Sequence, residues 1–364
     1  MSGCSADHYV DYATQLATFV VNMTAAGVPI YAIAMQNEPS TAQDYETCIF
    51  TDTQLHTFIP YLYNALAVAG VGSTKIIMPE ASSWTIDGNA LPTLGDPTTA
   101  AMVGIVSAHG YGVPNPSAFN SQYVQDKPVW ETEDATTDVY DPSISNGLTW
   151  ATTVHNYLTN GNVSAWHYWE AVWPPSWQPP YGTLPDNSAL TDANGNLAKR
   201  AYVLGQWAKF VRPGYQRIDV TNGTSLLVTA FADPVSHNWA IVAINSSGSA
   251  SAQTFNVAGS QASSVTPWVT SSTLSLAQQS PVPVSGGNFS YTLPAQSIVS
   301  LVGSESTAPP TNTPTATPVP GTATNTPRSM ATWTPTVTPT NTARGTPTAT
   351  ATATPTPRRH RRRP

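Results

Sequence analysis

The sequence predicts an α/β fold built on a parallel sheet, followed by a small antiparallel β-domain and a Thr/Pro-rich tail. Over residues 1–213, short apolar runs alternate with segments of helical periodicity, which is the signature of a parallel sheet. Over 214–303 the pattern changes to short runs of alternating polarity, which is typical of a β-sandwich. Over 304–364 Thr, Pro and Ala dominate, and this composition predicts a disordered linker with a basic end.

Strands and helices alternate through the first region. Short apolar runs predict strands at 31–35, 75–80, 104–109, 128–132 and 163–169. Apolar residues at helical spacing predict helices at 8–26, 53–69, 98–102, 148–158 and 197–211.

This strand count bears on the architecture, because a closed (β/α)8 barrel of the TIM type needs eight strands. We therefore interpret the region as the C-terminal part of such a barrel, with about three βα units belonging in front of Met1. An open doubly wound sheet is the alternative. It is disfavoured because no Gly-rich phosphate loop accompanies any strand.

The second region reads as a β-sandwich side domain. Alternating runs predict its strands at 225–231, 239–245, 252–257, 264–269, 289–293 and 297–302. The tail beyond it ends in a basic run, Arg358-Arg-His-Arg-Arg-Arg363, which we interpret as a solvated end.

Composition restricts the kind of partner. Only 10% of the residues are charged and the net charge is −7, which argues against nucleic acid. No apolar run is long enough to span a membrane. Eleven Trp and fifteen Tyr offer aromatic faces on which sugar rings stack, although most are expected in the core. Cys4 and Cys48 lack the spacing of a zinc site, and their pairing is left open.

The stretch Tyr31-Ala-Ile-Ala-Met-Gln-Asn-Glu-Pro39 places an acid where a strand stops. Pro39 cannot donate to a strand ladder, so Glu38 falls at the C-terminal mouth of the strand, where barrels of this type carry their chemistry. Asn37 beside it can hydrogen-bond a substrate 2-hydroxyl in the transition state.

Lys127-Pro-Val-Trp-Glu-Thr-Glu-Asp134 repeats this arrangement. Glu131 and Glu133 are predicted to point to the same side, because side chains alternate along a strand. Glu133 lies nearer the mouth, Glu131 is expected one layer deeper, and Asp134 is expected in a loop. Two carboxylates at two strand mouths indicate glycoside hydrolysis, which uses an acid/base and a second carboxylate.

Further polar and aromatic residues end the other strands. His109 and Tyr111 are expected to hold the nucleophile ionised through hydrogen bonds. Trp169 is expected to form a floor under the sugar, whereas Trp166 is as well placed for the core. No serine triad or clustered metal-ligand spacing stands out, so we predict no metal and no cofactor.

Several segments together resemble glycoside hydrolase family 30, and most closely its bacterial xylanases. They are Tyr31–Pro39, Trp130-Glu-Thr-Glu133, Ala165-Trp-His-Tyr-Trp169, Lys209-Phe-Val-Arg-Pro-Gly-Tyr-Gln-Arg-Ile218 and Tyr291-Thr-Leu-Pro-Ala-Gln-Ser297. The resemblance implies a (β/α)8 barrel fused to a β-sandwich, a retaining mechanism, Glu38 as acid/base and Glu133 as nucleophile. It extends from about residue 8 to residue 303.

One departure from the family pattern concerns specificity. Family members specific for glucuronoxylan carry an Arg after the last barrel strand, and here that run contains none. Trp173 and Trp177 in the same run suggest apolar stacking on sugar instead.

The sequence therefore predicts a secreted, monomeric endo-β-1,4-xylanase that acts on xylan or a related β-glycan, its signal peptide lost with the missing N-terminus. Alternatives within the family are a β-1,6-glucanase or a β-1,6-galactanase. Outside it, the alternative is a non-catalytic carbohydrate-binding protein or an inactive truncated remnant.

Overall fold

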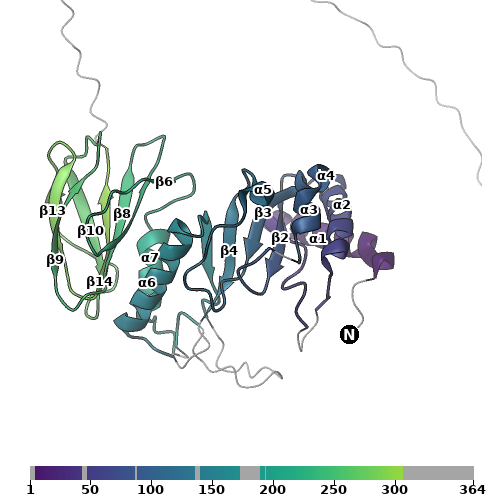
Figure 1. The fold of residues 1–364 in the computed structure, drawn as a ribbon, viewed down its shortest axis with the longest axis horizontal. Helices are drawn as coiled ribbons and strands as arrows, with labels where there is room; N and C mark the ends of the chain where they lie inside the picture. The colour runs from purple at the N-terminus through teal and green to yellow at the C-terminus, as the bar shows by residue number, and fades with distance from the viewer. Residues whose placement is uncertain are drawn as a thin grey trace, which may run out of the picture. The chain divides into compact units, whose positions relative to one another are not determined.

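A computed structural model of the chain describes residues 5–42, 47–86, 88–135, 140–172, 189–192 and 194–305. Met1–Ala308 forms one compact unit, drawn in Figure 1. The predicted linker, Trp173, Trp177 and Cys4 lie outside the described residues. Cys48 is disulfide-bonded. Within the described part, no helix has the length and apolar character needed to cross a membrane.

A five-stranded parallel sheet forms the first half of this unit. Its strands are β1 (Ala32–Ala34), β2 (Lys75–Ala81), β3 (Val103–Ala108), β4 (Val129–Asp134) and β5 (Ala165–Tyr168). They pair in chain order, β1-β2-β3-β4-β5, and every neighbouring pair is parallel. A doubly wound sheet reverses its strand order at a switch point, whereas a barrel does not. The order therefore confirms the prediction of a partial (β/α)8 barrel.

Helices precede the first of these strands and connect the others. They are η1 (Ala6–His8), α1 (Tyr9–Ala25), α2 (Asp52–Val68), α3 (Leu91–Gly95), α4 (Pro97–Ala100), α5 (Ser121–Val124) and α6 (Ile144–Thr159). The N-terminus of α2 is fixed by a capping box between Thr51 and Gln54. The buried faces of α1 and α2 share one hydrophobic cluster with the first strands of the sheet, in which Phe58, Ile59 and Leu62 are fully buried.

The second half of the unit is antiparallel. Its strands are β6 (Gln216–Ile218), β7 (Leu227–Ala232), β8 (Trp239–Asn245), β9 (Ser251–Asn256), β10 (Ser264–Thr270), β11 (Ala277–Gln278), β12 (Val282–Pro283), β13 (Asn288–Leu293) and β14 (Ser297–Gly303). A larger sheet has the order β11-β10-β14-β8-β7-β6, with β12 on β10, and a smaller sheet pairs β13 with β9. Trp239 and Phe289 stack across the two sheets at 6.0 Å between ring centroids.

Helix α7 (Lys199–Ala208) connects the two halves, and with α6 it packs on the larger antiparallel sheet (Figure 1). Val203 and Trp207 of α7 share a hydrophobic cluster with Val242 and Ile298 of that sheet. Gln206 is fully buried, and its side-chain oxygen accepts the backbone N–H of Ser300 at 3.1 Å.

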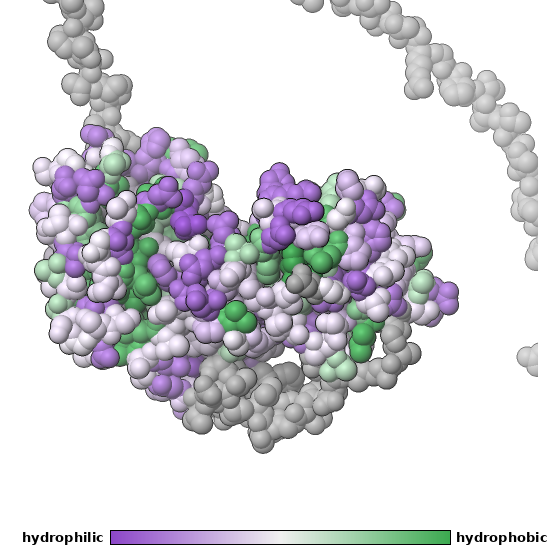
Figure 2. Space-filling view, in the orientation of Figure 1, coloured by the Kyte–Doolittle hydropathy of each residue, from purple (hydrophilic) through white to green (hydrophobic). Residues whose placement is uncertain are grey.

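The surface is mostly neutral and polar. Figure 2 shows a face that is largely pale, the tint of residues of intermediate hydropathy, with hydrophobic residues in a strip over the antiparallel strands. This distribution agrees with the low charged fraction of 10%.

One strand differs from its prediction in a way that concerns the site. Strand β4 continues to Asp134, which pairs with Tyr168 and is 5% exposed. The expectation of a loop at Asp134 is wrong, because the neighbouring strand β5 extends the ladder that far. The pairing is irregular between Glu131 and Asp134. The prediction that Glu131 and Glu133 face the same side assumed an unbroken alternation, which the strand does not have here.

Candidate active site

The carboxyl ends of the parallel strands gather a set of acidic side chains around one histidine. Glu38 follows β1, Glu80 lies in β2, His109 directly follows β3 and Glu133 lies in β4. These positions share one edge of the sheet, since the carboxyl ends of parallel strands meet there.

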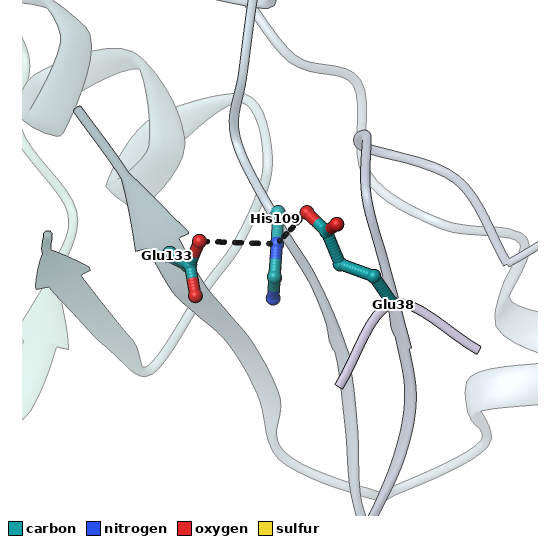
Figure 3. Close-up of side chains that lie close together, drawn as sticks. All are labelled: Glu38, His109 and Glu133. Atoms are coloured by element: carbon teal, nitrogen blue, oxygen red, sulfur yellow. Dashed lines mark hydrogen bonds and ion pairs between the residues drawn. The ribbon is translucent and has the colours of Figure 1, made fainter. Parts of the chain in front are cut away.

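The imidazole of His109 lies between Glu38 and Glu133, as Figure 3 shows. Its Nδ1 is 3.1 Å from Oε1 of Glu38 and 3.7 Å from Oε1 of Glu133. The donor atoms of the three residues lie within 4.8 Å of one another. His109 is fully buried and Glu38 is 8% exposed. The structure therefore brings together three residues that are separated by up to 95 positions (133 − 38) in the sequence.

Tyr111 completes the surroundings of Glu133. Its hydroxyl donates a hydrogen bond of 2.9 Å to Oε1 of Glu133. Burial raises the pKa of Glu133 above its ordinary value, while the His109 charge and the Tyr111 hydrogen bond lower it. His109 is closer to Glu38 than to Glu133, so Tyr111 makes the direct hydrogen bond to Glu133 that both residues were expected to make.

Glu131 occupies a different environment. It is fully buried, and its carboxyl oxygens accept the backbone N–H groups of Glu133 at 2.8 Å and His167 at 3.0 Å. Burial raises the pKa of Glu131 well above its ordinary value. Its carboxyl group thus supports the backbone of β4 and β5, in line with the deeper position expected for it.

Glu80 is a site residue that the sequence reasoning missed. It is 9% exposed, and its Oε1 accepts a hydrogen bond of 2.8 Å from the Thr132 hydroxyl. Its Oε2 lies 3.9 Å from Nε2 of His109. The signal was present, because Lys75-Ile-Ile-Met-Pro-Glu80 is a third strand that ends in an acid.

Comparison with known proteins decides the family. No protein-family model matches the chain. The chain is 33% identical to the glycoside hydrolase family 30 subfamily 8 xylanase Xyn30A from Clostridium acetobutylicum, with a TM-score of 0.70 over 83% of this chain and 73% of that one. It is 32% identical to a GH30 endoxylanase from Clostridium papyrosolvens C71, with a TM-score of 0.68 over 83% and 72%. The chain belongs to glycoside hydrolase family 30.

The curated relatives are also xylanases, and they are longer than the part of them that this chain matches. Glucuronoxylanase XynC of Bacillus subtilis (strain 168) is 30% identical over 305 residues, which cover 81% of this chain. The chain spans 66% of the length of the curated relatives it matches.

The other residues predicted for the site of this family 30 chain lie outside the group formed by Glu38, His109 and Glu133. Asn37 is exposed next to Glu38. Trp169 follows β5, is 45% exposed, and donates its backbone N–H to the Asp134 carbonyl at 2.9 Å. Glu170 beside it is half-buried, and burial together with the Glu133 charge raises its pKa to about 6. Trp173 lies outside the described residues.

Two carboxylates and a histidine are also ligand types that divalent cations accept. Among the residues that the structure describes, Glu38, His109 and Glu133 form the one group with donor atoms close enough to hold an ion. The absence of a metal therefore stays a prediction for this family 30 site, and a chelator tests it.

Proposed function

We propose that this chain is a retaining endo-β-1,4-xylanase that cleaves the xylan backbone. The observation that carries the proposal is the separation of the two acids, since facing oxygen atoms of Glu38 and Glu133 lie within 4.8 Å. Retaining glycosidases hold their carboxyl groups about 5–5.5 Å apart, whereas inverting enzymes need roughly 6.5–9.5 Å for a water molecule. A gap this small favours direct attack by one carboxylate.

The proposed roles follow from the neighbours of each acid. Glu133, held by the Tyr111 hydroxyl and facing the His109 ring, attacks the anomeric carbon. Glu38 protonates the departing oxygen, and a glycosyl-enzyme ester forms on Glu133. Glu38 then takes a proton from a water molecule whose oxygen attacks the anomeric carbon, which breaks the ester to Glu133 and releases the sugar with its original configuration.

The proposed substrate is the neutral xylan backbone. The relatives named above are xylanases, and one of them is named a glucuronoxylanase. Residues 170–198 contain no Lys or Arg that would pair with a glucuronate branch, and Glu170 adds a carboxyl group there. We therefore propose a glucuronate-independent enzyme, working as a secreted monomer with Asn37, Trp169 and Trp173 as further sugar contacts.

The experiment is reducing-sugar release from unbranched and glucuronate-branched xylan by the full chain and by Glu133→Gln. We expect release from both substrates, unchanged by EDTA, and its loss in the variant. Release from β-1,6-glucan or β-1,6-galactan alone would mean that the enzyme cleaves a β-1,6 linkage and not the proposed β-1,4 linkage. Xylan binding without sugar release would mean that the chain is a carbohydrate-binding protein and not an enzyme. Sugar release that survives Glu133→Gln would mean that Glu133 is not the nucleophile.

A further inference from the structure

Glu80 has no place in the two-carboxylate reaction, yet it is buried beside it. We propose that Glu80 is a positioning residue that holds His109 as an imidazolium between the two catalytic carboxylates. This inference rests on the proposed function, and it adds a third acid to the site.

The contacts of the His109 ring carry the argument. Its Nδ1 faces Glu38 and Glu133 at 3.1 and 3.7 Å, and its Nε2 faces Glu80 at 3.9 Å. Each ring nitrogen therefore faces a carboxylate, which accepts but does not donate when ionised. A neutral imidazole has a proton on only one nitrogen, whereas an imidazolium presents a proton to both sides. The arrangement fits the charged ring.

The titratable groups around the ring come from three strands. Its ion-pair partners are Glu38 after β1, Glu80 on β2 and Glu133 on β4, while Glu131 and Asp134 of β4 feel its charge from further away. Burial alone would lower the pKa of His109, but its contacts with Glu38 and Glu80 and the charge of Glu133 raise it to about 10. Glu38, Glu80 and Glu133 all raise the pKa of His109, and Glu80 does so from the ring nitrogen opposite the reacting pair.

The position of Glu80 is unusual for a structural residue. Its φ is +60° and that of Glu38 is +44°, a region that side chains other than glycine rarely occupy. The backbone N–H of Glu38 donates to the Glu80 carbonyl at 2.9 Å. Glu80 thus bonds to the backbone of the proposed acid/base, Glu38, and its side chain faces His109. Unfavourable backbone geometry concentrates at functional sites.

The charge on His109 has a use in the proposed reaction. Glu133 must be ionised to attack, and burial raises its pKa. A cation at 3.7 Å opposes that effect. Without the Glu80 carboxylate, His109 loses one of its counter-ions and releases its proton at lower pH, and above that pH Glu133 no longer faces a cation.

The test is an NMR titration of isotopically labelled histidine in the full chain, in Glu80→Gln and in Glu80→Asp. His109 is recognised by the loss of its signal in His109→Gln. We expect His109 to stay protonated beyond pH 8 in the unchanged chain. The midpoint should fall by at least about one pH unit in Glu80→Gln and by less in Glu80→Asp, which keeps the charge further away.

Asp134→Asn is the matched control, because it removes a buried carboxyl group that does not contact the ring, and it should move the midpoint least. An unchanged His109 midpoint in Glu80→Gln overturns the proposal. If that variant does not fold, an unchanged midpoint in Glu80→Asp does so.

The titration needs no substrate, so it stands even if the chain proves inactive. Where the chain is active, the fall of kcat/KM that accompanies loss of the His109 proton forms an alkaline limb, and this limb should move to lower pH in Glu80→Gln together with the His109 midpoint, with KM nearly unchanged. A purely structural Glu80 would lower stability and leave both the limb and the His109 midpoint in place.

Discussion

Glu38 and Glu133 have the same side-chain chemistry, and their neighbours separate them. Glu133 receives a hydroxyl hydrogen bond from Tyr111, whereas Glu38 is paired with the His109 ring. A bonded hydroxyl favours the ionised form of an acid, which a nucleophile requires. The acid/base must instead exchange a proton in each half of the reaction.

Azide distinguishes the two proposed roles. Each acid replaced by Ala should cost at least about 10²-fold in turnover of an aryl xyloside. Azide should restore turnover of Glu133→Ala with an α-glycosyl azide as product, because it enters from the side of the missing nucleophile. In Glu38→Ala it should give the β-azide, because it attacks the glycosyl-enzyme from the opposite side. NMR of the products measures this, and the reverse pair of products would exchange the roles.

Tyr111→Phe tests the hydrogen bond to Glu133. Losing a bond to a charged group costs about 1.5–3 kcal/mol, or roughly 10–100-fold in kcat. The bond lowers the pKa of Glu133, so its loss raises that pKa and moves the acid limb of the pH profile to higher pH. Tyr140→Phe removes a hydroxyl that donates to the Asn196 carbonyl, outside the site, and is the control. An unmoved acid limb in Tyr111→Phe would contradict the assignment.

Strands and helices with strong periodicity were predictable. All five parallel strands and helices α1, α2, α6 and α7 form where the apolar spacing predicts them, within a few residues at each end. The short α3 and α5 and the two-residue strands β11 and β12 were missed, since they carry too few residues for a period to show. The irregular pairing after Glu131 could not be predicted from the sequence either, because it depends on the register of β4 against β5.

The site was predictable in part for the same reason. Strand mouths place Glu38, His109 and Glu133 on one edge, as expected from the sequence. The spacing of residues along the sequence cannot show which acid His109 contacts, because that depends on the distances between the side chains. Glu80 was missed although the pattern that found Glu38 applies to it.

The first turn of α2 offers a test of local structure. The Thr51 hydroxyl accepts the Gln54 backbone N–H at 3.2 Å, and the Thr51 N–H donates to the Gln54 side chain at 2.8 Å. Thr51→Ala should lower the free energy of unfolding by about 1 kcal/mol in urea denaturation, with kcat unchanged. Thr53→Ala, which lies in the same turn without capping it, is the control and should cost less.

Helices α6 and α7 share a hydrophobic interior with the antiparallel domain. Trp207 donates its indole N–H to Thr229 at 3.2 Å, and Gln206 bonds to Ser300, both across the boundary between α7 and the larger sheet. Buried polar groups are costly when their partners leave. Separation of α7 from the larger sheet would leave these groups unpaired, so these contacts hold α7 and the antiparallel domain together.

Stability of the whole chain should depend on pH through Asp134. Burial raises its pKa from 3.8 to about 7. The folded state therefore keeps a proton that the unfolded chain has lost, and stability falls as pH rises from about 4 to about 7. At about 1.4 kcal/mol per pH unit, the loss amounts to at most roughly 4 kcal/mol. Asp134→Asn removes this titration, so it should stabilise the chain at pH 8 and change little at pH 4, as urea denaturation at both pH values measures.

Asp141 is the matched control for this pH dependence, because its shift has the opposite sign. Hydrogen bonds from Ser143 lower the pKa of Asp141, so the stability that this group contributes is present at neutral pH and is lost as pH falls below 3.8. Asp141→Asn should therefore lower stability slightly at pH 8, where Asp134→Asn raises it. Equal effects of the two substitutions at pH 8 would mean that the pKa of Asp134 is not raised in the folded chain.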